Sequence, residues 1–328
     1  MQRKTVLVTG VGSTTGISVI KGLRGQDEFR VRIVGTDTHG GNRIAGSSFC
    51  DAFYTVSPAG DPGYLAELLR ICEREGVDLL VPIVDPELPV IAEHAALFAD
   101  IGTEAVVAKS ETVRTCNDKL ATCRRLAEGG VPVPESRAAD EVAAPGELSY
   151  PVFVKPRGGV SSRDAFRVDT QEEFARARGR VSDLVVQELL AGEEYTTDVF
   201  CGPDGRVIAV VPRRRVQTRA GISYKGVTCH DERLIRWGVR ICEVLDLRGP
   251  ANIQCMVDGD DVRYFEVNPR FSGSLPLTIA AGVNTPLQML KLWDGQSAPD
   301  DLLPFEEVFM TRYWAEIFHP VEEPVPVS

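Results

Sequence analysis

The chain has 328 residues, of which 43% are hydrophobic and 25% charged, and its formal net charge is −11. This length and composition predict two or three domains with buried cores and exclude a disordered or low-complexity protein. The acidic balance argues against a protein whose affinity for nucleic acid rests on neutralising phosphates.

The cysteines and the apolar runs limit the cellular setting. The 8 cysteines contain no C-x-x-C pair, so neither a zinc site nor a disulfide framework is expected. No apolar run reaches the ~20 residues that a membrane span requires, and no apolar signal core follows the N-terminus. We therefore expect a cytoplasmic protein with no membrane partner and no nucleic-acid partner, and we regard a homodimer as compatible with the sequence.

The first third of the chain alternates predicted strands with predicted helices. The strands are expected at 5–8, 31–34, 78–84 and 106–108, and the helices at 17–24, 64–75 and 88–98. This order predicts a small, open parallel sheet with helices on both faces.

A glycine-rich turn follows the first predicted strand, in the stretch VTGVGSTTGISVIKGL. Gly10, Gly12 and Gly16 have the spacing of a dinucleotide-binding fingerprint. Asp37, at the end of the second apolar run, would be the acid that binds the ribose. Taken alone, these stretches favour an NAD-dependent reductase.

The pattern changes after a predicted helix at 110–128. Apolar runs flanked by tight turns follow, which is typical of antiparallel sheets. Strands are expected at 152–155, 165–168, 184–189, 195–200, 207–212, 253–257 and 262–267, with helices at 171–178 and 233–245.

The most informative stretch is ANIQCMVDGDDVRYFEVNPRFSGS, which reads as a β-hairpin. A loop at 259–261 would set Gln254 opposite Glu266, and Asn268 would share the face of Glu266 because side chains alternate along a strand. Arg270 lies just beyond the strand. Oxygen ligands too few to enclose an ion suit Mg²⁺ held together with substrate phosphates.

The alternative is that this hairpin end is an exposed polar strand end. Phe265 and Val267 flank the glutamate, and unpaired buried charge is rare, which makes that interpretation the weaker one. The hairpin therefore predicts a substrate that carries phosphate.

Upstream segments offer cations and a base pocket. Lys155 ends the predicted strand PVFVKP, and the small-residue loop RGGVSS after it has backbone N–H groups that would fold over phosphates. The run LVVQELLAGEE then supplies an amide and carboxylates. Each signal is weak alone, since two glutamates after a glycine are usually a solvated turn.

Taken in order, these stretches resemble the ATP-grasp superfamily, most closely its carbamoyl-phosphate-synthase-like branch of carboxylate–amine ligases. The matching stretches are VLVTGVGSTTG, LLVPIVDPEL, CNDKLATCRRLAEGGVPVPES, PVFVKPRGGVSS, VVQELLAGEEYTTDVF, RAGISYKGVT and NIQCMVDGDDVRYFEVNPRFSGSLPLTIAAGVN. The last is the most specific, because this branch uses Gln in the metal pair where other branches use Asp.

The resemblance implies a fold of mixed α/β and α+β class. A Rossmann-like pre-ATP-grasp domain (1–108) would precede a two-lobed ATP-grasp fold with antiparallel sheets. The small lobe with its linker helix would span 109–188 and the large lobe 189–318, before a mobile tail at 319–328.

The resemblance also implies a nucleotide site for ATP. Lys119 and Lys155 would neutralise the α- and β-phosphates under the glycine loop, Gln187 would meet the adenine amino group, and Glu194 the ribose hydroxyls. The remaining residues assigned to ATP are Gly158, Gly159, Ser161, Ser162, Glu188 and Leu190.

At the phosphoryl end, Glu266 would bridge two Mg²⁺ ions, which Mn²⁺ would be able to replace. Gln254 would bind one ion and Asn268 the other. Lys225 would cover the γ-phosphate, and Arg270 would stabilise the transferring phosphoryl group and the oxyanion that follows.

The implied reaction joins a small-molecule carboxylate to an amine. The carboxylate attacks the γ-phosphate, giving an acyl phosphate and ADP, and the amine then displaces phosphate. Segments 158–162 and 218–226 would act as lids against water. The alternatives are release of a carbamoyl or acyl phosphate, the reductase named above, and a nucleotide-binding regulator without turnover.

Two departures from the family pattern concern the acceptor pocket and the lid. Ile222 stands where a glutamate is expected, and the loop Gly159-Val160-Ser161-Ser162 has fewer glycines than expected. Both leave ATP use untouched.

The substrate side is the least determined part of the site. Ser13 and Thr14 would begin a helix that faces the crevice. The further candidates for substrate binding are Asp85, Glu87, Asp198, Arg213, Arg219, Ser272 and Ser274. The competing interpretations are an acid-rich helix N-terminus at 85–87 and a solvated charge cluster at 213–215.

Overall fold

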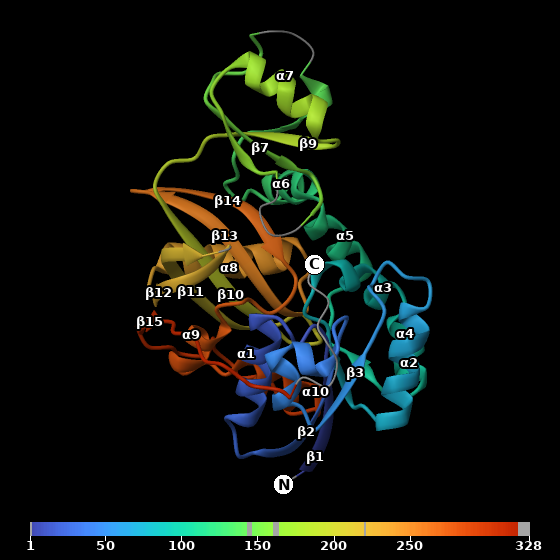
Figure 1. Cartoon of the computed structure of the whole chain (residues 1–328). Helices are drawn as coiled ribbons and strands as arrows, with labels where there is room; N and C mark the ends of the chain where they lie inside the picture. Colours follow the sequence, from blue (N-terminus) through green and yellow to red (C-terminus); the bar gives the residue numbers. More distant parts are fainter. Residues whose placement is uncertain (1, 143–145, 160–163, 220, 321–328) are drawn as a thin grey trace.

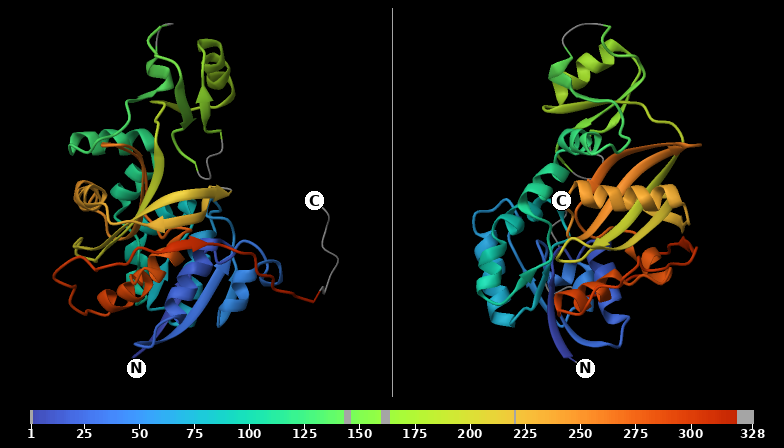
Figure 2. Two further views of the ribbon diagram at one scale, coloured as in Figure 1. Left: turned by 90° about the vertical axis from the view of Figure 1, so that its left-hand side faces the viewer. Right: turned by 180° about the vertical axis from the view of Figure 1, so that it is seen from behind.

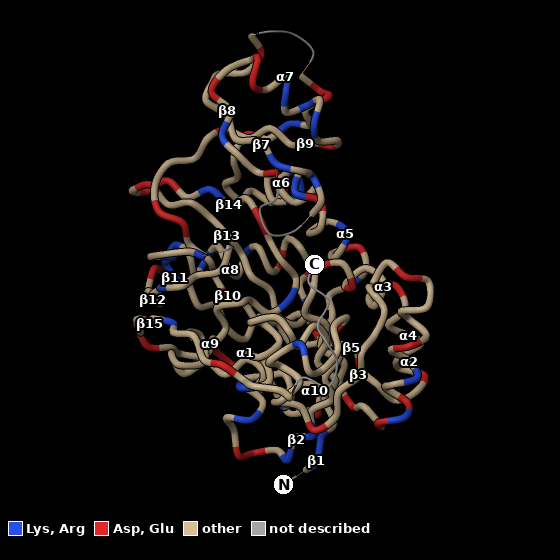
Figure 3. The backbone as a smooth tube through the Cα atoms, in the orientation of Figure 1, with Lys and Arg blue, Asp and Glu red and all other residues tan. Residues whose placement is uncertain are grey.

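The computed structural model describes residues 2–142, 146–159, 164–219 and 221–320. Three sheets follow one another along the chain, with the second set apart at one end of the molecule (Figures 1 and 2). Basic and acidic residues are interspersed over all three parts (Figure 3). No helix in the described ranges is both long and apolar enough to cross a membrane.

The first sheet is parallel and five-stranded, in the order β3-β2-β1-β4-β5, as the alternating pattern predicted. Its strands are β1 (Gln2–Val8), β2 (Phe29–Asp37), β3 (Ala52–Thr55), β4 (Leu79–Val81) and β5 (Glu104–Ala105). The helices of this part are α1 (Thr14–Arg24), α2 (Tyr64–Glu75), α3 (Leu88–Glu93) and α4 (Ala95–Asp100).

Two helices predicted as continuous are broken. The helix expected at 88–98 divides at His94, which separates α3 from α4. The helix expected at 110–128 divides into α5 (Ser110–Asn117) and α6 (Lys119–Glu128). Asp118 has an extended backbone and its side chain accepts the N–H groups of Leu120 and Ala121, so it begins a new helix inside the periodic stretch.

The second sheet is antiparallel, in the order β6-β9-β7-β8. Its elements are β6 (Ser136–Ala138), β7 (Val152–Pro156), β8 (Phe166–Val168), α7 (Gln171–Arg180) and β9 (Leu184–Glu188). Short β6 escapes the sequence pattern, as does β3 in the first sheet. Both are strands of only three or four residues.

The third sheet is the largest, antiparallel, in the order β14-β13-β10-β11-β12-β15. Its strands are β10 (Glu193–Cys201), β11 (Val207–Arg219), β12 (Ile222–Thr228), β13 (Gly249–Asp258), β14 (Asp261–Asn268) and β15 (Phe309–Thr311). The helices are α8 (Glu232–Val244), α9 (Leu275–Ala280) and α10 (Thr285–Trp293). Of the 218–226 segment, expected as a lid, residues 218–219 end β11 and residues 222–226 lie in β12, and residue 220 lies outside the described residues.

One hydrophobic core joins the first and third sheets. Val8 and Ile33 of the parallel sheet belong to the same buried cluster as Phe200, Val211 and Met289. Close approach depends on a glycine, since a Cβ at Gly22 of α1 would lie 2.8 Å from Pro286 of α10. The second sheet has its own cluster. The domain boundaries at 108, 188 and 318 stay a prediction, and most of the tail lies outside the described residues.

The glycine turn is tightly packed and makes its own hydrogen bond to Asp37. The Asp37 carboxylate accepts the N–H of Gly12 at 2.8 Å, so the acid that would bind a ribose is used within the turn. Residue 46, in the 3₁₀ segment Ala45–Phe49, packs so tightly that a Cβ there would lie 1.7 Å from the carbonyl oxygen of Val11. These contacts count against the dinucleotide interpretation.

Candidate active site

A cleft of about 870 Å³ lies where the three parts meet. The loop after β4 and the start of α1 form one end, β7 and β9 form the other, and β10, β13 and β14 form the floor. This volume is in the upper part of the range for small-molecule sites, with room for a nucleotide and a second substrate.

The predicted metal ligands meet on this floor. Gln254 lies directly opposite Glu266, and the pairing shifts register between Gln254 and Cys255. The Asn268 amide donates from Nδ2 to Oε1 of Glu266 at 3.1 Å, which leaves its own Oδ1 free to face the cleft. These neutral amides and one carboxylate are oxygen ligands that fit Mg²⁺.

Lys155 reaches the same point from β7. Its side chain is nearly buried, and Nζ lies 3.3 Å from the carbonyl oxygen of Phe265 and 5.3 Å from the centre of the Phe265 ring. Burial lowers the pKa of Lys155 below its ordinary value, and the charge of Glu266 opposes that shift. The buried ammonium group of Lys155, close to Glu266, would be stabilised in its charged form by a bound anion such as a phosphate.

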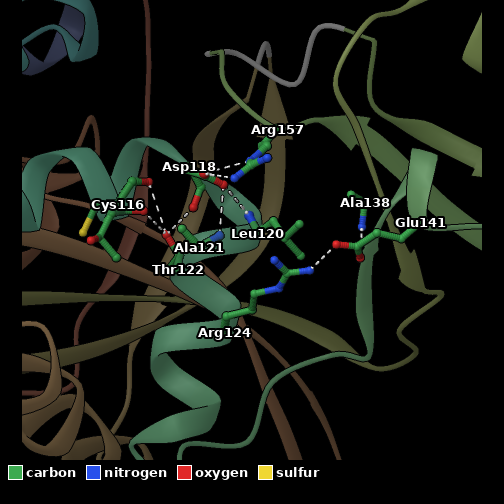
Figure 4. Close-up of polar contacts among 10 residues, drawn as sticks. Cys116, Asp118, Leu120, Ala121, Thr122, Arg124, Ala138, Glu141 and Arg157 are labelled. Atoms are coloured by element: carbon green, nitrogen blue, oxygen red, sulfur yellow. Dashed lines mark hydrogen bonds and ion pairs between the residues drawn. The ribbon is translucent and has the colours of Figure 1, made fainter.

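Lys119 stands at the first position of α6, and its Nζ contacts the carbonyl oxygen of Gly159 at 2.9 Å. The Asp118 carboxylate caps α6 and also pairs with Arg157 Nε at 2.8 Å (Figure 4). The Lys119 N–H donates to the carbonyl oxygen of Arg157. The break between α5 and α6 thus ties Lys119 to the glycine loop.

A second ion pair in this region joins α6 to the segment that follows β6. Arg124 of α6 pairs with Glu141 at 2.6 Å, and Glu141 also accepts the N–H of Ala138 (Figure 4). Hydrogen bonds from Arg124 and the Ala138 N–H lower the pKa of Glu141.

The predicted adenine end lies between β9 and the third sheet. Gln187 is buried and donates from Nε2 to Ser136 Oγ at 2.8 Å, while Glu188 accepts the N–H of Glu135. Phe153 and Met256 add apolar walls that the sequence interpretation missed. Their positions on β7 and β13, two residues from Lys155 and Gln254, were the available signal.

The opposite end carries Arg270 and Asp85. Arg270 donates from Nε and Nη2 to the two carboxylate oxygens of Asp85, each at 2.8 Å. Ser13, Thr14, Ser272 and Ser274 line the cleft near this pair.

Comparisons with known proteins agree with this geometry. Residues 180–317 match the family model "ATP-grasp in the biosynthetic pathway with Ter operon", and residues 6–106 match "PylC-like, N-terminal domain". Residues 180–317 of this chain thus match an ATP-grasp family, and its first third matches a different, N-terminal domain family.

Relatives of this chain include the carbamoyl phosphate synthase large chains of Agathobacter rectalis and Deinococcus radiodurans. The first is 28% identical over 198 residues, covering 54% of this chain and 18% of the relative. The second is 28% identical over 254 residues, covering 69% of this chain and 24% of the relative. The chain thus spans about a fifth of the length of the curated relatives that it matches.

Solved structures show the same ATP-grasp fold at low identity. N5-carboxyaminoimidazole synthetase from Staphylococcus aureus, complexed with ADP, has a TM-score of 0.72 at 15% identity, covering 94% of this chain and 80% of that one. The L-amino acid ligase from Bacillus licheniformis has a TM-score of 0.69 at 16% identity, covering 89% and 75%. The predicted fold class is confirmed.

Not every predicted site residue reaches the ATP-grasp cleft. Glu87 is buried and accepts the N–H groups of Ile83 and Val84 at 2.7 and 2.9 Å, besides the hydroxyls of Thr9 and Tyr64. Burial raises its pKa, against those hydrogen bonds. The assignment of Glu87 to substrate was wrong, because four donors already occupy its oxygens.

Asp198 and Arg213 form a buried pair beneath the cleft. They contact each other directly, Arg213 donates to Ser272 Oγ at 3.0 Å, and Thr278 donates to Asp198 at 2.6 Å. Neither side chain lines the cleft, so their assignment to substrate was wrong. The solvated-cluster alternative was also wrong for Arg213, which is 1% exposed.

Two further predicted residues, Arg219 and Lys225, are not part of the cleft lining. Arg219 is exposed and stacks on Tyr224, with its guanidinium carbon 3.9 Å from the ring centre. Lys225 lies in β12, paired with Gln217 and Thr311, and does not line the cleft. Lys225 thus lies in a strand rather than in the expected loop, and its role at the γ-phosphate stays a prediction. Ser161 and Ser162 lie outside the described residues.

Arg215, which strand parity groups with Arg213 as a cleft-facing arginine that could clamp a carboxylate, lines the cleft. Its side chain is 8% exposed and pairs with Glu194, the residue expected to bind the ribose, and it donates to the carbonyl oxygen of Gly221 at 2.7 Å. Strand parity with Arg213 was the only signal for it in the sequence.

Proposed function

We propose that the protein is an ATP-dependent, ADP-forming ligase that joins a small-molecule carboxylate to an amine through an acyl phosphate. The observation that carries the proposal is one continuous cleft floor. Gln254, Glu266 and Asn268 line this floor, Lys155 reaches it from β7 and contacts the carbonyl oxygen of Phe265, and Arg270 lines the cleft two residues beyond Asn268. Phosphoryl transfer needs this series of cations and oxygen ligands, because catalysis there is chiefly positioning and charge stabilisation.

The nucleotide would bind between the second and third sheets. Phe153 and Met256 offer apolar contact for a base, and the 188–190 backbone offers hydrogen bonds to its edge. Lys155 and Lys119 lie between that end and the glutamate, where they would meet the phosphates. The named ADP complex of N5-carboxyaminoimidazole synthetase, which shares this fold, supports the assignment.

Gln254, Glu266 and Asn268 would hold Mg²⁺, which would neutralise charge that develops on the β- and γ-phosphates when bound. Among the described residues no group of three His, Cys, Asp or Glu side chains offers a competing metal site. The number of ions, and replacement by Mn²⁺, stay predictions.

The acceptor carboxylate would lie at the Arg270 end, beside the N-terminus of α1. Its oxygen would attack the γ-phosphorus as ADP leaves, and Arg270 would donate N–H groups to the equatorial oxygens. The amine would then attack the acyl carbon and expel phosphate. Ile83, Val84 and Ile222 line this end and would help to exclude water from the acyl phosphate.

Turnover with candidate substrates tests the proposal. The protein would be incubated with Mg-ATP and panels of amino acids, other carboxylates and amines, and ADP release would be followed. We expect ADP only when a matching carboxylate is present, and product mass shows whether an amine is captured or the acyl phosphate is released. A folded protein that binds Mg-ATP but releases ADP with none of these panels contradicts the ligase proposal.

A further inference from the structure

Three of the five N–H groups of the Arg270 guanidinium have a hydrogen-bond partner among the described residues. Nε and Nη2 bind the two oxygens of Asp85 at 2.8 Å each, and Nη1 donates to the carbonyl oxygen of Phe271 at 3.1 Å. A guanidinium has five N–H groups, so two remain, one on each terminal nitrogen. Arg270 lines the cleft, and these two are available to a ligand there.

Asp85 comes from the N-terminal parallel sheet, 185 residues away along the chain. Its side chain is 16% exposed and that of Arg270 is 20% exposed, so water screens the pair only partly. The described residues give Asp85 no other side-chain partner. A bidentate contact of this kind sets the plane of the guanidinium as well as its position.

The 3₁₀ helix that carries Asp85 (Asp85–Glu87), together with the residues just before it, is held by hydrogen bonds to Glu87. Glu87, two residues on, accepts the N–H groups of Ile83 and Val84 and the hydroxyls of Thr9 and Tyr64. Glu87 therefore fixes this segment, and Asp85 projects from it to Arg270.

The position of Asp85 would be unfavourable for phosphate without its partner. A second, smaller cavity of about 240 Å³ adjoins the cleft and is lined by Asp85 together with Lys119, Glu266 and Asn268. An unpaired carboxylate there would repel a transferring phosphoryl group, whereas the pair with Arg270 is close to neutral.

We propose that Asp85 is a positioning residue for phosphoryl transfer: it orients Arg270 so that the two unused N–H groups face the transferring phosphoryl group. It acts through Arg270, whose Nε and Nη2 each donate to one of its two oxygens. The N-terminal domain thereby takes part in the chemistry of the ATP-grasp lobes. This inference rests on the proposed function.

The test measures binding of a phosphoryl mimic, so it needs no known acceptor. Affinity for Mg-ADP would be measured by calorimetry with and without aluminium fluoride, in wild type, Asp85→Asn, Arg270→Ala and the double variant. We expect Asp85→Asn to reduce the gain from aluminium fluoride by roughly ten- to a hundredfold, the usual effect of losing an orienting partner. Affinity for Mg-ADP alone should stay within about threefold of wild type.

The double variant decides whether Asp85 acts through Arg270. If it does, Asp85→Asn has no further effect once Arg270 is alanine, because the two residues act as a unit. Additive losses, or no loss in Asp85→Asn, overturn the proposal. Asp294→Asn is the matched control: Asp294 pairs with Lys4 at 2.8 Å with exposed fractions of 14% and 15%, away from the cleft.

Two further measurements distinguish a loss of folding from a loss of phosphoryl binding, and a failure of this inference from a failure of the proposed function. Arg270→Lys keeps the charge but cannot make the bidentate contact, so it should reproduce Asp85→Asn even if that variant folds poorly. A folded wild type that binds no Mg-ADP overturns the proposed function and this inference with it. A wild type that binds Mg-ADP but gains nothing from aluminium fluoride overturns only the inference.

Discussion

Gln254 on β13 lies directly opposite Glu266 on β14 because one residue is bulged out of the ladder between them. Asp258 pairs with Asp261 at the turn, and this register holds as far as Cys255 opposite Tyr264. Continued without a shift, it would set Gln254 opposite Phe265. The bulge at Phe265 instead brings the amide and the carboxylate together, as bulges near active sites often do.

Glu266→Gln tests whether this pair serves catalysis. We expect turnover to fall by at least about a hundredfold, because the only carboxylate among the three predicted metal ligands is lost. Steady-state ADP release measures this, with circular dichroism confirming the fold. Asp261→Asn on the same hairpin, where the side chain is 56% exposed, should keep wild-type activity. Unchanged turnover in Glu266→Gln would remove the hairpin from the mechanism.

Asp198→Ala should be strongly destabilising. The change leaves the Arg213 guanidinium buried without its counter-ion, and breaking a buried pair in this way costs about 3–5 kcal/mol in free energy of unfolding. Urea denaturation measures it. Glu193→Ala is the control on the same two strands: Glu193 pairs with Arg214 in the open, with exposed fractions of 59% and 41%, and its loss should cost no more than about 1 kcal/mol. Equal losses would show that burial of Asp198 and Arg213 does not matter.

We expect the affinity for Mg-ATP to decrease at alkaline pH because of Lys155. Burial lowers its pKa below 10.5, so the lysine loses its charge as pH rises through the depressed pKa. Affinity for Mg-ATP should fall in that window, below the pH at which an exposed lysine titrates. Lys155→Arg should bind Mg-ATP without this fall, because a guanidinium stays charged. A fall that persists in Lys155→Arg would assign the titration to another group.

The same depressed pKa affects folding with a definite sign. Between the lowered pKa and 10.5 the unfolded chain binds more protons than the folded one, so the contribution of Lys155 to stability rises with pH in that window. Lys155→Met should flatten this part of the stability profile while it weakens nucleotide binding. Chemical denaturation at several alkaline pH values measures the slope, and an unchanged slope in Lys155→Met would contradict the assignment.

Thr14→Val tests the substrate end of the cleft. Thr14 lines the cleft at the start of α1, and its hydroxyl has no partner among the described residues. Loss of a hydrogen bond to a charged group would raise the KM of the acceptor about tenfold and leave that of ATP nearly unchanged. Ser13 is less suitable for this test, because its hydroxyl caps α1 by accepting the N–H of Gly16. Ser13→Ala would therefore also lower the free energy of unfolding by about 1 kcal/mol. A rise in the KM of ATP instead would restore a nucleotide role for the glycine turn.

Local patterns in the sequence predicted many of the strands and helices and the order of the candidate site residues along the chain. Alternation of apolar runs with helical periodicity predicted the parallel sheet, and turn residues predicted the β13–β14 hairpin. The period of two along β14 placed Glu266 and Asn268 on one face. Such features depend on neighbours within a few residues, which is why they are readable from the sequence.

Only the tertiary structure decided which charges face the cleft. Asp85 and Glu87 differ by two positions and have the same chemistry, yet one meets Arg270 and the other is enclosed by Thr9 and Tyr64. Likewise Arg213 is buried against Asp198 whereas Arg215 lines the cleft. The burial of an ionised side chain depends on partners far away in the chain, whose positions no local period encodes.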